Sequence, residues 1–195
     1  MRRMLTLVAI IPLMFVLSAC GNEAEVKKLE VFQPETTTSL AINARRLEII
    51  DNWLMPLKAP YVEHELKKPP AASLIEWASL VVQPKGGSGE VILNISEASV
   101  KHEELPPAEG FLNSLKDNQE TRIRVTLSAQ LLWIQPVGNY TGTAELAAKT
   151  SQSLPESATP SDYEIATQNL VGRALALIDL QAREEIAKID GMILP

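Results

Sequence analysis

The chain has 195 residues, with 18 Lys and Arg, 24 Asp and Glu, and a single cysteine. Its net charge of −6 at pH 7 is poorly suited to binding nucleic acid or an anionic lipid surface, so we expect neither as a partner. One cysteine excludes an internal disulfide, and the length suffices for one domain with its own core.

Residues 1–19 have the layout of a secretory signal peptide. Arg2 and Arg3 precede an apolar run from 4 to 16, and small residues follow that run. The run is shorter than the roughly 20 residues of a membrane-spanning helix, and Pro12 interrupts it, so a transmembrane anchor is the weaker alternative. Removal of 1–19 would leave 16 Lys and Arg against 24 Asp and Glu, a net charge of −8.

The end of this leader, Leu17-Ser18-Ala19-Cys20 followed by Gly21, resembles a bacterial lipobox. The resemblance implies cleavage between Ala19 and Cys20, a lipid on the Cys20 sulfur and acylation of the new amino terminus. Several acyl chains on one residue hold a protein stably on a membrane, because each buried methylene contributes about 0.8 kcal/mol. Gly21 resembles the outer-membrane sorting class of enteric bacteria, so we expect a periplasm-facing outer-membrane lipoprotein, with the inner membrane as the alternative.

The mature chain divides into three parts by composition. Residues 20–39 mix charges, a proline and Thr/Ser, and predict a lipidated N-terminus with a flexible tether. Residues 40–190 carry the periodic patterns of a single domain, and 191–195 form a short tail. Within 40–50 the apolar alternation changes phase, which predicts a strand with a bulge or bend. Four prolines make 51–70 an irregular crossing segment.

Alternating and helical patterns follow in order along the domain. Pro70 opens a predicted helix over 71–82, whose apolar stripe is Leu74, Trp77, Ala78 and Val81. Strands are predicted over 90–100, 122–133 and 141–151, with a possible helical turn at 111–116 and a turn at 135–139. Ser161 and Glu164 resemble a capping box for a helix reaching Ile189. Its predicted apolar stripe comprises Ile165, Leu170, Val171, Ala174, Leu175, Ile178, Ala182, Ile186 and Ile189.

This order of elements predicts an α+β fold. We expect a small, mostly antiparallel sheet of about four strands in the order β-α-β-β-β-α, with two helices packed on one face. The regular alternation of polar and apolar residues in the strands leaves the other face in water.

The two histidines are the first candidates for chemistry. In an extended segment His64 would share a side with Val62 and Leu66, so we expect a histidine hydrogen-bonded at the core edge. With Cys20 carrying lipid, the chain has too few histidines for an ordinary zinc site, and we expect no metal or other cofactor. A pH-responsive role for His64 or His102 stays open.

No catalytic motif is complete. Ser88 lies in Gly87-Ser88-Gly89, but the nucleophile-elbow pattern would require glycine at position 90, where Glu90 stands. The same glycines lack the lysine of a phosphate-binding loop, so a turn is the preferred interpretation. The carboxylates, among them Glu97 and Glu103, are explained by a solvated surface without glycosidase pairing.

Three tryptophans are the aromatic candidates for recognition. Trp77 and Trp133 lie on predicted apolar faces and are expected in the core. Trp53 belongs to the irregular segment, so Trp53 and His64 are the speculative contacts with a partner.

The mature region resembles a family of uncharacterised envelope lipoproteins of Gram-negative bacteria. The resemblance lies in Val62-Glu63-His64, Pro69-Pro70 before a helix containing Trp77, glycines within 86–89, and Ala98-Ser99-Val100. A looser likeness, in element order only, is to auxiliary lipoproteins of lipid-transport and lipopolysaccharide-assembly systems. Neither implies a catalytic residue.

These observations favour a non-enzymatic, membrane-anchored binding or assembly module of the cell envelope. Its expected partners are a membrane, through the lipid anchor, and an envelope protein, with a role in the transport of lipid or another envelope component. The alternatives are an envelope hydrolase with an unfamiliar site at His64 or His102, and a purely structural lipoprotein.

Overall fold

The computed structural model describes residues 31–34, 37–106 and 119–195. The predicted signal peptide, Cys20 and the predicted turn at 111–116 lie outside these ranges. Within them the elements are β1 (Leu40–Ile42), β2 (Arg46–Asp51), the 3₁₀ helix η1 (Glu63–Glu65), α1 (Pro70–Val81), β3 (Val82–Pro84), β4 (Glu90–Glu104), β5 (Gln119–Gln135), β6 (Tyr140–Pro155) and α2 (Pro160–Ile186).

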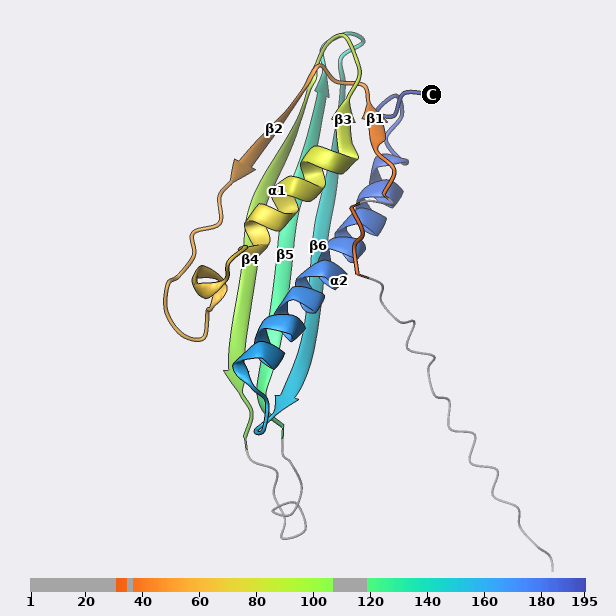
Figure 1. Cartoon of the computed structure of the whole chain (residues 1–195). Coiled ribbons are helices and arrows are strands. Elements are labelled where there is room, and N and C mark those ends of the chain that lie inside the picture. Colours follow the sequence, from red (N-terminus) through yellow and green to blue (C-terminus); the bar gives the residue numbers. More distant parts are fainter. Residues whose placement is uncertain (1–30, 35–36, 107–118) are drawn as a thin grey trace, which may run out of the picture.

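A four-stranded sheet in the order β2-β4-β5-β6 forms the body of the domain. β2 pairs with β4 in parallel, whereas β4, β5 and β6 pair antiparallel. Both helices cover the same face of this sheet (Figure 1). The predicted α+β class, with two helices on one face of a mostly antiparallel sheet, is therefore confirmed.

The strand alternation places the predicted apolar side chains in the core. Val91, Leu93 and Ile95 are fully buried on β4, and a register shift between Ile95 and Glu97 marks a bulge. Beyond the bulge Ala98 and Val100 continue the inward face, so the alternation persists in a new phase. β4 and β5 are each longer than predicted, since both extend toward the 104–119 connection.

The phase change within 40–50 separates two strands instead of bending one. β1 pairs in parallel with β3 to form a second, two-stranded sheet, and β2 then joins the larger sheet. The Asn43 carbonyl at this crossing accepts hydrogen bonds from Trp133 Nε1 at 2.8 Å and from Gln135 Nε2 at 3.1 Å. These long-range hydrogen bonds fix the chain where it passes from one sheet to the other. Local periodicity could not predict them.

The start of α2 differs from the predicted Ser161 capping box. Thr159 is the N-cap, with its Oγ1 accepting from Asp162 N–H at 3.3 Å and the Asp162 carboxylate accepting from Thr159 N–H at 2.8 Å. Pro160 suits the first helical turn, because its missing N–H has no partner there. Ile165, predicted on the apolar stripe, is 55% exposed, and α2 ends at Ile186 rather than Ile189.

Packing extends past the predicted boundaries of the domain at both ends. Phe32 N–H donates to the Gly172 carbonyl on α2 at 3.0 Å, and Leu194 N–H donates to the Ala41 carbonyl at 2.8 Å. A side chain at Gly172 would lie 2.3 Å from Val31 Cγ1, so glycine permits this close approach. In the described part of the chain, no helix has the length and apolar character needed to cross a membrane.

Candidate functional site

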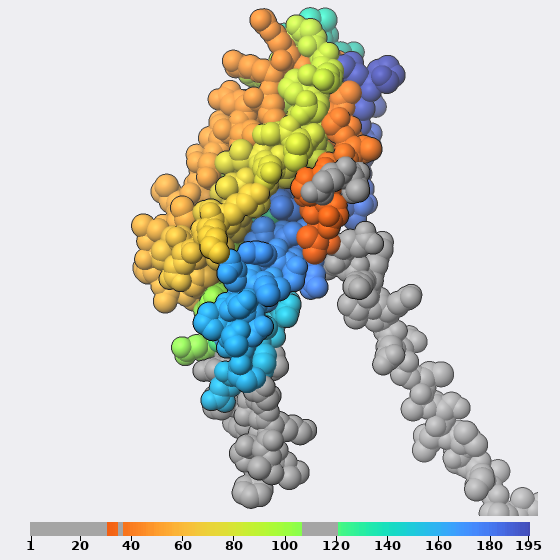
Figure 2. All heavy atoms as spheres, viewed as in Figure 1, coloured from red at the N-terminus to blue at the C-terminus, as the bar shows by residue number. Residues whose placement is uncertain are grey.

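A cavity of about 560 Å³ lies between α1 and α2 on the covered face of the sheet. Its wall comes from five places in the sequence: residues 32–34, residues 62–68 around η1, the helix α1, His102 of β4 and the helix α2. Figure 2 shows this face, where the yellow α1, the blue α2 and the orange N-terminal segment meet. The volume falls within the range of about 300–1,000 Å³ that is usual for small-molecule sites.

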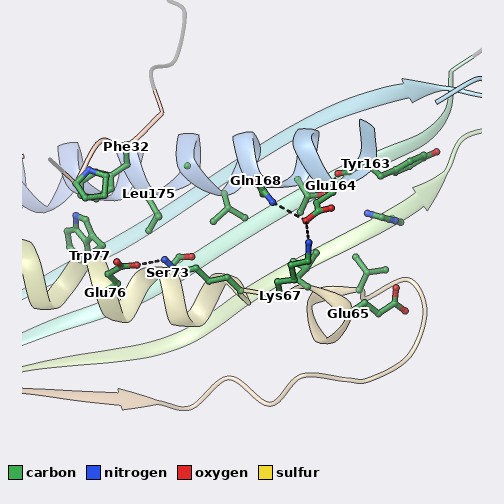
Figure 3. A pocket seen from close by; sticks show the side chains of 18 of the residues that line it. Phe32, Glu65, Lys67, Ser73, Glu76, Trp77, Tyr163, Glu164, Gln168 and Leu175 are labelled. Carbon is green, nitrogen blue, oxygen red and sulfur yellow. Dashed lines mark hydrogen bonds and ion pairs between the residues drawn. The ribbon is translucent and has the colours of Figure 1, made fainter. Parts of the chain in front are cut away.

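Apolar side chains form most of the cavity wall. Trp77 is fully buried, and Val171 and Leu175 of α2 are each 7% exposed. The half-buried Phe32 and Leu66 complete this surface from the N-terminal segment and from the chain that precedes α1. Trp77, Leu175 and Phe32 gather at one end of the cavity in Figure 3.

Charged residues form ion pairs at the rim of the cavity. Lys67 Nζ donates to Glu164 Oε1 at 3.0 Å, which joins the chain before α1 to α2, and Gln168 Nε2 donates to the same oxygen at 3.3 Å (Figure 3). Lys68 pairs with Glu76. Exposed pairs of this kind contribute about 0–1 kcal/mol, so they shape the rim more than they stabilise the fold.

The opposite end of the cavity contains His102 and Tyr163, whose ring centroids lie 5.4 Å apart. His102 Nε2 is buried and has no hydrogen-bond partner. Burial lowers the pKa of His102, while the nearby Glu65 carboxylate acts in the opposite direction. The effect of burial is the larger of the two, so the neutral imidazole is favoured.

His64 lies elsewhere, and its predicted environment is wrong. The segment is a 3₁₀ turn, so successive side chains rotate by about a third of a turn instead of alternating. Glu63 is therefore the fully buried residue, and its Oε2 accepts from Val100 N–H at 3.1 Å. His64 lies on the surface with its Nε2 3.6 Å from Glu65 Oε1.

Trp53, the other speculative partner contact, packs against the core and against Tyr61, with ring centroids 6.2 Å apart. Its Nε1 is buried without a hydrogen-bond partner. The following Leu54 and Leu57 are 86% and 65% exposed. The structure therefore does not bring Trp53 and His64 into the cavity, and the exposed apolar side chains beside Trp53 belong to its neighbours.

The remaining residues singled out in the sequence pack in the core or form hydrogen bonds within the fold. Trp77 and Trp133 are core residues as predicted, with Trp77 Nε1 donating to Asp179 Oδ1 at 3.0 Å. Ser88 Oγ donates to Gln135 Oε1 at 2.6 Å in the turn before β4, as the turn interpretation expects. Among residues 31–34, 37–106 and 119–195, no group of three or more His, Cys, Asp or Glu could hold a metal ion.

Among the residues that line this cavity, His102 is one that the sequence pattern could have identified as unusual. It continues the inward alternation of Ala98 and Val100 on β4, so a histidine stands where an apolar side chain is expected. Ser73 and Thr167 likewise interrupt the buried stripes of α1 and α2. What the sequence could not show is that these three positions converge on one space.

Chemically, the cavity can hold an apolar group and offer one uncharged imidazole. A histidine beside a carboxylate is also a feature of hydrolytic sites, and Glu65 lies on the same wall. A nucleophilic mechanism needs a hydroxyl or thiol bonded to the base, and His102 Nε2 has no such partner. The geometry thus provides a surface that can bind a ligand, but it does not provide a complete set of catalytic groups.

No family model and no curated protein matches this sequence. The solved structures that are similar to it include the following two. A minor lipoprotein from Acinetobacter baumannii has 15% identity and a TM-score of 0.35, over 75% of this chain and 90% of the other. A Xanthomonas campestris protein of the family DUF330 has 8% identity and a TM-score of 0.33, over 82% and 93%. Similarity at these TM-scores carries no argument about function.

Proposed function

We propose that this chain is a membrane-anchored lipoprotein of the bacterial cell envelope whose domain is a non-enzymatic binding module. The observation that carries the binding role is the cavity between α1 and α2, with its mostly apolar wall. A mostly apolar cleft of about 560 Å³ has the size of ordinary small-molecule sites, so it offers room for an apolar ligand.

The anchoring part of the proposal rests on the lipobox-like residues 17–20. Cys20→Ser should release the protein from membranes into the periplasm and abolish incorporation of labelled fatty acid. Membrane retention without label would favour the signal-anchor alternative. Density-gradient separation of the two membranes tests the outer-membrane location, and recovery with the inner membrane would exclude it.

The binding part can be tested with a neutral apolar probe, N-phenyl-1-naphthylamine, on the chain from Gly21 to Pro195. Ser73 lines the cavity and Ser79 lies exposed on the same helix, so the two serines form a matched pair. Ser73→Phe should reduce probe fluorescence at least fivefold by occupying the cavity, whereas Ser79→Phe should leave it unchanged. Equal fluorescence in both variants would contradict binding at this site.

The module would serve in the transport of lipid or another envelope component, together with an envelope protein. The surface we propose for that protein is the loop after β2, where Leu54 and Leu57 are highly exposed. A photo-crosslinking amino acid at position 54 should capture one defined membrane protein, and the same group at Val137, which is 70% exposed at the β5–β6 turn, should not. Capture of the same abundant proteins from both positions would argue against a specific partner.

One observation favours a hydrolase as the second candidate: His102 and Glu65 line the same cavity. This alternative predicts hydrolysis of p-nitrophenyl esters by the wild-type protein and loss of that activity in His102→Gln. Turnover that is absent, or that persists unchanged in His102→Gln, would exclude this site as the catalyst.

A further inference from the structure

The segment 31–34 forms part of the cavity wall and is also seated on α2. Phe32 and Pro34 line the cavity, and Phe32 N–H donates to the Gly172 carbonyl at 3.0 Å. Gly172 lines the cavity as well, so the seat of this segment and the binding space share a residue. In Figure 2 the orange N-terminal segment lies against the blue α2, beside the yellow α1.

Glycine at position 172 makes this seat possible. A Cβ there would lie 2.3 Å from Val31 Cγ1 and 3.4 Å from Val31 Cβ. Val31 therefore fills the space that a side chain on α2 would need. The segment is seated by this apolar contact and by the hydrogen bond of the neighbouring Phe32 main chain.

Thr37 and Thr38 are held by stronger hydrogen bonds than that of Phe32. Arg183 Nη2 donates to the Thr38 carbonyl at 2.6 Å and to Thr37 Oγ1 at 3.2 Å. Hydrogen bonds from a charged donor are stronger than those between neutral groups. The segment 31–34 can therefore separate from α2 while Thr37 and Thr38 stay bound, and this local opening would remove Phe32 from the cavity wall.

An apolar ligand in the cavity has an aromatic surface to contact at the strap end. Trp77, Leu175 and Phe32 gather there (Figure 3). A ligand that buries apolar surface against Phe32 loses this contact when the segment separates, so it binds the seated state more tightly. Such a difference in affinity shifts the segment toward the seated state, and by linkage seating raises the affinity for the ligand by the same factor.

We propose that residues 31–34 are a ligand-responsive strap: an apolar ligand in the cavity and the seating of this segment on Gly172 favour each other. This inference rests on the proposed binding function and adds its regulation. The strap lies between Cys20, the predicted lipid attachment site, and the first strand. Occupancy of the cavity would therefore change how the chain next to the predicted anchor is held.

The test measures the exposure of position 31 in the full chain, in isolated membranes. Val31→Cys places a thiol at the Gly172 contact, and a water-soluble maleimide modifies this thiol when the segment separates. The apolar probe trifluoromethylphenyldiazirine, kept in the dark, should lower the modification rate about fivefold or more. Ser73→Phe, which occupies the cavity, should abolish this protection. Ser79→Cys, an exposed position on α1, should show no protection.

A second measurement follows the reciprocal effect, by illuminating the same probe and locating its adducts by mass spectrometry. Val31→Cys combined with Gly172→Cys should lock the strap when oxidised, because the Cβ separation of 3.4 Å is close to the roughly 3.5–4.5 Å of disulfides. Labelling of cavity residues should be at least as strong in the oxidised form as in the reduced form. Phe32→Ala should weaken it about fivefold, whereas Val137→Ala, at the exposed β5–β6 turn, should not.

The outcomes separate the strap from the binding function. Cavity labelling without protection of Val31→Cys, or with equal protection of Ser79→Cys, would overturn the strap and leave apolar binding intact. Faster modification of Val31→Cys would mean that the ligand displaces the segment, which also overturns the proposal. Weaker labelling of the oxidised form would contradict the coupling. Absence of cavity labelling in the wild-type chain would contradict the proposed binding function itself.

Discussion

The two ends of the α1–α2 interface differ in how their polar atoms are satisfied. At one end Trp77 Nε1 donates to Asp179, and Arg183 binds the same carboxylate with its Nε at 2.8 Å and the Thr38 carbonyl with its Nη2 at 2.6 Å. At the other end His102 Nε2 is buried with no partner, beside a cavity. Buried polar groups are usually paired, and the first end meets this rule while the second end is an exception to it. The difference separates an end where the polar groups are paired within the chain from an end where one buried nitrogen has no partner.

The largest expected effect comes from truncating a large side chain of the packed core. Trp133 is 1% exposed, so Trp133→Ala should lower the free energy of unfolding by about 3–5 kcal/mol, through lost burial and the cavity left behind. Urea denaturation measures this loss. Leu54→Ala is the control, because Leu54 is 86% exposed and its removal should change the midpoint little. Similar losses in both variants would contradict the assigned core.

A smaller loss should follow when the satisfied polar network is opened. Asp179→Ala leaves Trp77 Nε1 buried without its acceptor, and we expect a loss of about 1–3 kcal/mol in the free energy of unfolding. The control is Glu185→Ala, which breaks only the surface pair with Lys188 and should have a much smaller effect. An Asp179→Ala variant as stable as Glu185→Ala would show that the network does not stabilise this end.

The N-cap of α2 comes next, because it positions Tyr163 at the cavity. Thr159→Ala should lower the free energy of unfolding by about 0.5–2 kcal/mol by removing the acceptor for Asp162 N–H. Thr159 also lowers the pKa of Asp162 through its hydroxyl and its backbone N–H, so this contribution is lost as the pH falls through that lowered pKa. Ser161→Ala, at the cap predicted from the sequence, is the comparison. A larger loss of stability in Ser161→Ala than in Thr159→Ala would indicate that the helix is capped at Ser161, as the sequence predicts.

The smallest effect on the free energy of unfolding is expected from His102, and this effect depends on pH. Because burial lowers the pKa of His102 in the folded state, the unfolded chain binds a proton more readily below its ordinary pKa of about 6.5. The free energy of unfolding should therefore decline as pH falls from that value toward the lowered pKa and then level off.

His102→Leu should flatten this decline and, at pH 7.5, leave stability unchanged or slightly higher, because it removes a polar atom that lacks a partner. Denaturation at several pH values measures both. A marked loss of stability in His102→Leu at pH 7.5 would mean that His102 has a structural partner, and the contrast between the two ends would fail.

The sequence by itself determined the fold class, the two helices and the three long strands. Period-two alternation in 90–100, 122–133 and 141–151 and the apolar stripe of 71–82 persist in the structure, because each pattern allows one face to be buried. The lipobox-like residues 17–20 are likewise a local pattern, and the lipid anchor that they predict stays a prediction.

Only the tertiary structure decided where local patterns are interrupted. Asn43 turns between two sheets because Trp133 and Gln135, some 90 residues away, bind its carbonyl. His64 faces solvent because the chain coils into a 3₁₀ turn that buries Glu63. The cavity forms because β4, α1, α2 and residues 32–34 meet there. Periodicity records which face of an element is buried, but a site assembled from distant segments depends on how those faces meet.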